Sequence, residues 1–320
     1  MDSIHVSMAS GGAYVALYGG FWERLELIPA GLSFRKKITS FSGSSAGALT
    51  GATLALGVPA SRLAEDVRSG GMGRHKYARA IAVALGMRKS MYSGKHYYNR
   101  FCSLCSRAKY NRVPVHIAVT DQQLVQRVIP YRVTDSAENV MGSAVASASI
   151  PWVLPARVIP PYGQCVDGSV SRSSFPVSKV LDVLRNRSGQ LILFNCCPWP
   201  GFRKHTGPTT LAARLRYTYG DALYNHGMES IGQEIRGFMF RDGIYDIRVD
   251  NMSGPPRVSS KGNLHVIFVA PTSAQFELCG GNDSIARLDY RKRSPVIEAM
   301  LRQGRAMANE FAVRYCTVQL

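Results

Sequence analysis

Residues 36–56, KKITSFSGSSAGALTGATLAL, place a β-prone stretch, a serine between two glycines, and an Ala- and Leu-rich run in direct succession. Residues 36–42 predict a strand, and residues 48–56 predict a helix. Residues 4–9 and 13–27 repeat this order, a strand and then a helix, around a turn of two glycines. Strands that alternate with helices at this spacing favour a mostly parallel sheet covered on both faces.

The remainder of the chain continues the α/β pattern. The periodicity predicts further strands at residues 114–120, 126–131, 157–160, 164–166, 189–195 and 264–270, and helices at residues 136–147, 177–187 and 295–315. We therefore expect one domain over residues 1–320, with a three-layer α/β/α arrangement and helices on both faces of a mostly parallel central sheet. We expect a basic insertion at about 68–112 and an irregular insertion at about 200–262.

The composition is that of a globular protein. The chain has 320 residues, of which 46% are hydrophobic and 19% charged, and this excludes collagen-like, coiled-coil and disordered classes. No apolar run reaches the roughly 18 to 20 residues of a membrane-spanning helix, and no secretory signal follows Met1. Seven cysteines are too few for a disulfide framework. We therefore expect a cytoplasmic protein without a signal peptide or transmembrane segment.

The charge balance is strongly basic and localised. The net charge is +18, and residues 67–120 contain eleven Lys or Arg but no acidic residue. Such a stretch is either a solvated surface or a binding surface for polyanions, which include phospholipid head groups and nucleic acid. No nucleic-acid-binding motif accompanies the charge, which disfavours nucleic acid. Within this stretch, residues 74–100 combine an apolar run with cations and tyrosines, and predict either a core-facing helix or an interfacial helix or lid on anionic lipid.

The segment Gly43-Ser44-Ser45-Ala46-Gly47 fits the G-x-S-x-G pattern of a nucleophile elbow. In such an elbow a sharp turn from strand to helix forces the central serine into a strained conformation, so the residues two before and two after it must be small. The helix that follows directs its positive end and free N–H groups at the serine, which favours a developing oxyanion. Ser45 is therefore the candidate nucleophile, and Gly43 and Gly47 form the elbow.

The base that would activate this serine is either a histidine or a carboxylate. None of the seven histidines stands in a recognisable signature; they are His5, His75, His96, His116, His205, His226 and His265. Among carboxylates, Asp167 ends a short predicted strand and is followed by Gly168 in a turn. Asp242-Gly243 is a second copy of this dipeptide with less strand character before it.

Taken together and in order, these motifs resemble those of the patatin-like phospholipases. The shared features are the glycine turn after the first strand, the G-x-S-x-G elbow, the segment 146–151 (ASASIP), and a strand that ends in Asp-Gly. The resemblance implies a Ser-Asp dyad without histidine, with Ser45 as nucleophile and Asp167 as base. It also implies that the backbone N–H groups of Gly11, Gly12 and Ala13 form the oxyanion hole, and that neither a metal nor a cofactor takes part.

The chain departs from the family pattern at three positions. Ser10 stands where the family has its leading glycine, Tyr14 stands where the family has Arg or Lys, and Ser169 follows Asp-Gly where a Gly or Ala is usual. Cys102-x-x-Cys105 is only half of a zinc site, so we expect no metal there.

The resemblance implies an enzyme that cleaves carboxylic esters of phospholipids or lysophospholipids, of phospholipase A type, through an acyl-enzyme. We expect it to work in the cytoplasm or peripherally at an anionic membrane surface; the sequence gives no indication of the oligomeric state. Two alternatives stay open at this stage. One is a generic esterase with a histidine-containing triad, and the other is a catalytically impaired basic scaffold of the same fold that binds anionic membranes or nucleic acid.

Overall fold

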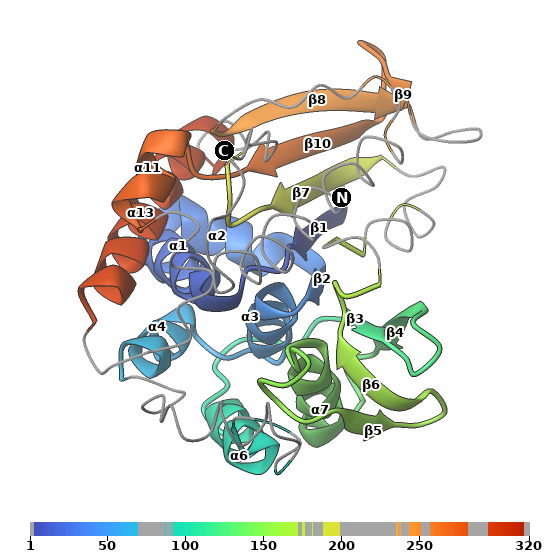
Figure 1. Ribbon diagram of the computed structural model, residues 1–320. Helices are drawn as coiled ribbons and strands as arrows, with labels where there is room; N and C mark the ends of the chain where they lie inside the picture. The colour runs from blue at the N-terminus through green and yellow to red at the C-terminus, as the bar shows by residue number, and fades with distance from the viewer. Residues whose placement is uncertain are drawn as a thin grey trace, which may run out of the picture.

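A single mixed sheet, mostly parallel at its centre, organises the protein (Figure 1). The computed structural model describes residues 3–69, 87, 90, 92–171, 175–176, 181, 188–198, 235, 237, 243–250, 257–280 and 294–316. In the described residues the strands are β1 (Ser3–Met8), β2 (Ile38–Ser44), β3 (Val115–Thr120), β4 (Gln126–Tyr131), β5 (Arg157–Ile159), β6 (Gly163–Asp167), β7 (Gly189–Phe194), β8 (Tyr245–Asp250), β9 (Arg257–Val258) and β10 (Leu264–Val269).

The centre of the sheet is parallel and its edges are antiparallel. Strands β3, β2, β1, β7 and β10 lie side by side in that order, and each pairs with its neighbour in parallel. Antiparallel partners extend both sides, because β8 pairs with β10 and β9 with β8, while β4 and β6 pair with β3 and β5 with β6. The expected α/β class with a mostly parallel central sheet is confirmed.

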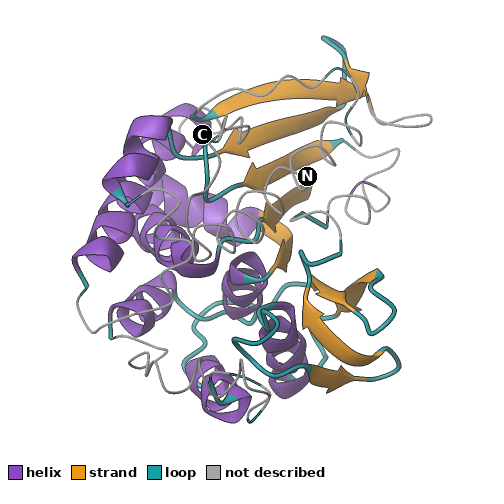
Figure 2. Ribbon diagram, viewed as in Figure 1, coloured by secondary structure: helices purple, strands orange, loops and turns teal. Residues whose placement is uncertain are grey.

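The described helices gather on one side of the strands (Figure 2). They are α1 (Val15–Leu27), α2 (Pro29–Lys37), α3 (Ala46–Ala55), α4 (Ala60–Arg68), α6 (Gly94–Cys105), α7 (Ala137–Ser147), α11 (Ser273–Leu278) and α13 (Pro295–Phe311), with the short 3₁₀ helix η1 (Gly12–Tyr14) and the π-helix η3 (Ala312–Cys316). Local signals set several of their starts. Pro29 opens α2, the Ser136 hydroxyl accepts the Asn139 N–H at the start of α7, and Thr272 caps α11.

Both faces of the sheet are buried. Along β7, Leu191 and Leu193 belong to one apolar cluster, while Ile192 and Phe194 belong to another. Because side chains alternate along a strand, these two clusters lie on opposite faces. The larger cluster contains the described helices, and the smaller one contains Phe175, Leu181 and Ile235 from the opposite side. Continuous apolar strands such as LILF therefore follow from burial on both faces.

The structure differs from the sequence predictions in several elements. Strand β8 lies inside the segment that we expected to be irregular, and residues 36–37 belong to α2 rather than to the following strand. Helices α4 and α11 were not predicted, and α6 coincides with the helix predicted at 74–100 only over residues 94–100. The single-domain boundary and the two insertions stay predictions, and the predicted helix at 177–187 lies outside the described residues apart from Leu181. Much of the predicted lid at 74–100 also lies outside them. No helix in the described ranges has the length and apolar character to cross a bilayer.

Candidate active site

Ser45 occupies the sharp turn between β2 and α3. Its backbone has φ 52° and ψ −120°, a conformation that non-glycine residues rarely adopt, and its side chain is buried. The two flanking glycines make this turn possible. A Cβ atom on Gly47 would lie 2.2 Å from the carbonyl oxygen of Met8 in β1, and a Cβ atom on Gly43 would lie 2.5 Å from the backbone of Gly47. The helix can therefore approach the strands only because both side chains are absent.

Asp167 ends β6 and contacts Ser45 directly. The Ser45 hydroxyl donates a hydrogen bond to the Asp167 carboxylate, and Ser169 donates to Oδ1 from its N–H at 3.0 Å and from its hydroxyl at 2.7 Å. Asp167 is only 2% exposed. Burial raises the pKa of its carboxyl, while the hydrogen bonds from Ser45 and Ser169 act in the opposite direction. A carboxylate with a raised pKa is a stronger base.

Sheet pairing brings these two residues together. β2 and β6 pair with the same edge of β3, opposite β4, so that Ala118 pairs with Ser44 and the next residue, Val119, pairs with Asp167. Gly168 turns the chain directly over β3, since a Cβ atom there would lie 2.2 Å from the carbonyl oxygen of Ala118. The shared edge of β3 thus brings the end of β2, which leads to Ser45, next to the end of β6 at Asp167.

The glycine turn after β1 lies at the same edge of the sheet as Ser45. β1 and β2 are parallel with Met8 opposite Gly43, so the turns that follow these residues lie next to each other. Gly12 and Ala13 begin η1, which packs against α3, and Gly12 has φ 51°. The N–H groups at the start of a helix have no intrahelical acceptor, so this turn presents backbone donors at the edge where Ser45 lies.

The departures from the family pattern in this turn have structural explanations. Tyr14 is buried, and its ring stacks on that of Phe276 in α11 at 5.2 Å between centroids. Burial raises the pKa of the Tyr14 hydroxyl far above its usual value. The position that carries a cation in the family is therefore part of the apolar core here. The Ser10 carbonyl accepts a hydrogen bond from the Cys196 thiol at 3.1 Å, which fixes the start of the turn.

The described histidine side chains bond to other partners. His5 bonds to the Ser40 hydroxyl, and His265 bonds to Asp246 at 2.6 Å between β10 and β8. His116 bonds to the backbone of Phe41, and burial lowers the pKa of its imidazole. His75, His205, His226 and the side chain of His96 are outside the described residues. Within those residues, the carboxylate of Asp167 receives hydrogen bonds from serines.

The cysteine motif on α6 gives no metal site. Cys102 and Cys105 are free thiols, and burial raises the pKa of Cys105 to about 12. Over the part of the chain that the structure describes, no group of three or more His, Cys, Asp or Glu side chains is arranged to hold a metal ion.

Sequence reasoning underestimated two serines. Ser169 appeared only as a minor departure from the family pattern, yet both its donors hold Asp167. The signal was available, because Asp commonly accepts the N–H of the residue two positions later in an Asx-turn. Ser147 appeared only as one letter of the segment 146–151, and its hydroxyl accepts the Ser45 N–H at 2.9 Å. No local pattern predicts that contact.

Comparison with known proteins gives one family match. The model of the patatin-like phospholipase family matches residues 6–181. Among curated proteins there is no match. Among solved structures, VipD from Legionella pneumophila is 12% identical with a TM-score of 0.38, over 97% of this chain and 67% of VipD. Human GIVD cytosolic phospholipase A2, in complex with methyl gamma-linolenyl fluorophosphonate, is 11% identical with a TM-score of 0.45, over 98% of this chain and 58% of the human chain. The present chain is thus shorter than either.

Proposed function

The chain belongs to the patatin-like phospholipase family, a family of lipid acyl hydrolases, and on this premise we propose that it cleaves carboxylic esters of phospholipids or lysophospholipids. The proposed catalytic pair is Ser45 and Asp167. The observation that carries the proposal is the hydrogen bond from the strained Ser45 to a buried carboxylate. A nucleophile in contact with a base, at a helix N-terminus, is the arrangement that acyl transfer requires.

The reaction begins with proton transfer. Asp167 accepts the proton of the Ser45 hydroxyl as the oxygen attacks the ester carbonyl carbon. The electron pair of the C=O bond moves to the carbonyl oxygen, and the N–H groups of the 11–13 turn stabilise the resulting negative charge. Collapse of this intermediate breaks the ester bond, and the alcohol leaves with the proton held by Asp167. The acyl group is then bound to Ser45.

The second half of the reaction regenerates the serine. Asp167 deprotonates a water molecule, which attacks the acyl carbonyl carbon, and the fatty acid leaves as Ser45 recovers its proton. Burial raises the pKa of Asp167, which supports its use as a base in both halves. The N-terminus of α3 adds the positive end of its dipole on the same side as the alkoxide.

A fluorophosphonate probe and a substrate assay test this proposal together. We expect the probe to label the folded wild type at Ser45 and Ser45→Ala to abolish both labelling and phospholipid hydrolysis. Asp167→Asn should lower hydrolysis by about 10²- to 10⁴-fold. Ser42→Ala is the matched control. It removes a different buried serine hydroxyl, in the strand β2 that leads to Ser45, and it should keep wild-type rates.

Two outcomes would favour the alternatives. An unlabelled Ser45 in folded protein would support the catalytically impaired scaffold. An inactive histidine variant combined with an active Asp167→Asn would support the histidine-containing triad.

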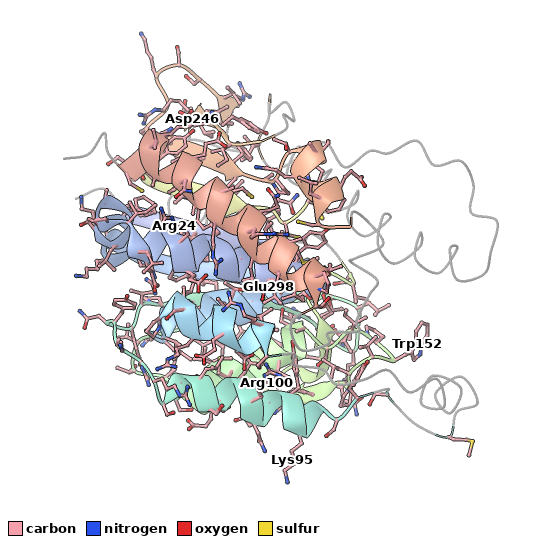
Figure 3. The ribbon with its side chains drawn as sticks, turned by 90° about the vertical axis from the view of Figure 1, so that its left-hand side faces the viewer. Arg24, Lys95, Arg100, Trp152, Asp246 and Glu298 are labelled. Atoms are coloured by element: carbon pink, nitrogen blue, oxygen red, sulfur yellow. The ribbon has the colours of Figure 1, made fainter. Side chains whose placement is uncertain are left out.

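We also propose that the enzyme works at an anionic membrane surface. The support is the distribution of charge around α6. Arg68 and Arg100 are neutralised by Glu298 and Asp66, whereas Lys95 at the start of α6 is exposed and extends away from the protein body (Figure 3). Three further exposed cations follow α6 in the chain: Arg107, Lys109 and Arg112. Each cation near an anionic bilayer contributes about 1 kcal/mol to binding.

A further inference from the structure

The hydroxyl of Ser147 connects the candidate nucleophile to the neighbouring strand. Ser147 is the last residue of α7 and is completely buried. Its oxygen accepts the backbone N–H of Ser45 at 2.9 Å, and its proton is donated to the carbonyl oxygen of Ala118 in β3. A single side chain therefore joins the elbow, α7 and β3.

The same short segment also holds the candidate base. The carbonyl of Ser147 accepts the N–H of Gly168 at 3.1 Å, and the carbonyl of Ser149 accepts the N–H of Asp167 at 3.0 Å. The backbones of both members of the Ser45–Asp167 pair are thus bonded to residues 147–149. Any shift of this segment would move the two members relative to each other.

The Ser45 N–H needs such a partner because the sheet does not supply one. β2 ends at Ser44, which is the last residue opposite β3, and Ser45 then turns to φ 52°. A strained backbone conformation persists only where its surroundings determine it strongly. The Ser147 hydroxyl oxygen accepts the Ser45 N–H in place of a carbonyl oxygen of a neighbouring strand. The same hydroxyl donates to the carbonyl oxygen of Ala118 in β3, the strand that also pairs with β6.

We propose that Ser147 is a positioning residue that keeps the Ser45 elbow aligned with Asp167. It acts through the Ser45 N–H and contacts neither the substrate nor the reacting atoms. The expected effect of Ser147 on kcat and on the labelling rate rests on the proposed function. The position requires an acceptor and a donor on one short side chain, which a serine or threonine hydroxyl provides and an alanine does not.

Four proteins test the proposal: the wild type, Ser147→Ala, Ser147→Thr and Ser143→Ala. Ser143 lies one turn earlier on α7, is also completely buried, and shares a hydrogen bond with the Tyr131 hydroxyl. Its removal therefore costs a buried hydrogen bond of the same helix without contact to the Ser45–Asp167 pair. Each protein is measured for thermal unfolding, amide hydrogen exchange at Ser45, fluorophosphonate labelling rate, and kcat and KM on a soluble ester.

We expect Ser147→Ala to lower kcat and the labelling rate by about 10- to 100-fold while KM changes less than about twofold, since a displaced nucleophile weakens chemistry rather than binding. The Ser45 amide should exchange faster because its acceptor is gone. Ser147→Thr should recover most of both losses, and Ser143→Ala should keep wild-type kcat and exchange at Ser45.

Wild-type kcat in Ser147→Ala would overturn the proposal. So would an equal loss of kcat in Ser143→Ala and Ser147→Ala, because the effect would then be general destabilisation. If the wild type itself is not labelled, the proposed function fails and the exchange measurement decides this inference alone. Faster exchange at Ser45 in Ser147→Ala, but not in Ser143→Ala, would still support positioning, and unchanged exchange would refute it.

Discussion

The contact between α3 and β1 at Gly47 can be tested with a single methyl group. A Cβ atom on Gly47 would lie 2.2 Å and 2.5 Å from the carbonyl oxygen and carbon of Met8, and 2.7 Å from the carbonyl oxygen of Ala9. These are backbone atoms at the end of a central strand and cannot rotate away. Ordinary contact between carbon atoms begins at about 3.5 Å. In Gly47→Ala the helix must therefore retreat from the strand by about 1 Å.

This retreat separates the two parts of the candidate site. The start of α3 carries Ser45, and β1 leads into the 11–13 turn. A misplacement of about 1 Å costs about 10²-fold in rate, which corresponds to about 2.7 kcal/mol of transition-state stabilisation. Overpacking costs about 1–3 kcal/mol of folding stability, and the helix preference of Ala over Gly returns up to about 1 kcal/mol. We expect Gly47→Ala to be about 10²-fold less active and about 0–2 kcal/mol less stable.

Gly51→Ala is the matched control on the same helix. Gly51 lies one turn after Gly47 and is also buried, but a Cβ atom there meets the terminal methyl of Met8 at 3.2 Å and Phe41 Cβ at 3.6 Å. The end of a methionine side chain can move, so this variant should keep its activity within about twofold and gain up to about 1 kcal/mol.

The measurements are kcat/KM on a soluble ester and urea unfolding of both variants. Wild-type kcat/KM in Gly47→Ala would refute the reasoning, because the helix and strand would then tolerate separation without loss of alignment. Equal losses in Gly47→Ala and Gly51→Ala would refute it as well, since the effect would not depend on the backbone contact.

Three further predictions follow from the charges around the site and on the surface. Burial raises the folded-state pKa of the Asp167 carboxyl, so the stability of the wild type falls as pH rises from the unfolded pKa through the folded one. The melting temperature of Asp167→Asn should therefore exceed that of the wild type by more at neutral pH than near pH 3. A difference that is the same at both pH values would contradict this. The Ser169 hydroxyl lowers the pKa of the same carboxyl, so Ser169→Ala should move the acid limb of the pH–kcat/KM profile to higher pH, and an unmoved limb would argue against Asp167 as the base. In flotation with anionic vesicles at low salt, Lys95→Ala combined with Lys109→Ala should weaken binding by about 2 kcal/mol and leave soluble-ester hydrolysis unchanged; equal wild-type binding to neutral and anionic vesicles would disprove membrane recruitment by charge.

The central elements were predictable because their burial is uniform. LILF in β7 and VIFV in β10 are apolar without interruption, as expected for strands covered on both faces. β8 was missed because its sequence is YDIRVD, in which charged residues alternate with apolar ones, and because it lies inside a segment rich in Gly and polar residues. Among the described strands, only the two-residue strand β9 lies beyond it in the sheet. The boundary between α2 and β2 was misplaced by two residues, since Lys36 and Lys37 suit the last turn of a helix as well as the start of a strand.

The sequence indicated several candidate partners for Ser45 and did not by itself select one. Asp167 and Asp242 both precede a glycine, and the family resemblance favoured Asp167. The structure shows Asp167 in contact with Ser45, whereas Asp242 lies outside the described residues. Ser147 and Ser169, the two serines that hold this pair, were present in the motifs, but the sequence analysis predicted no hydrogen-bond partner for either.

From its sequence alone this protein is an α/β chain with a strained serine at a strand-to-helix turn. Local sterics are sufficient for that conclusion, because the glycines on either side of Ser45 permit a conformation that larger residues forbid. Which groups meet the serine depends on tertiary structure, since β2 and β6 must both pair with the same edge of β3 before Asp167 can reach Ser45. The same packing places the Ser147 hydroxyl beside the Ser45 N–H and directs Tyr14 into the core. These contacts join residues far apart in the chain, and no local pattern encodes their distance.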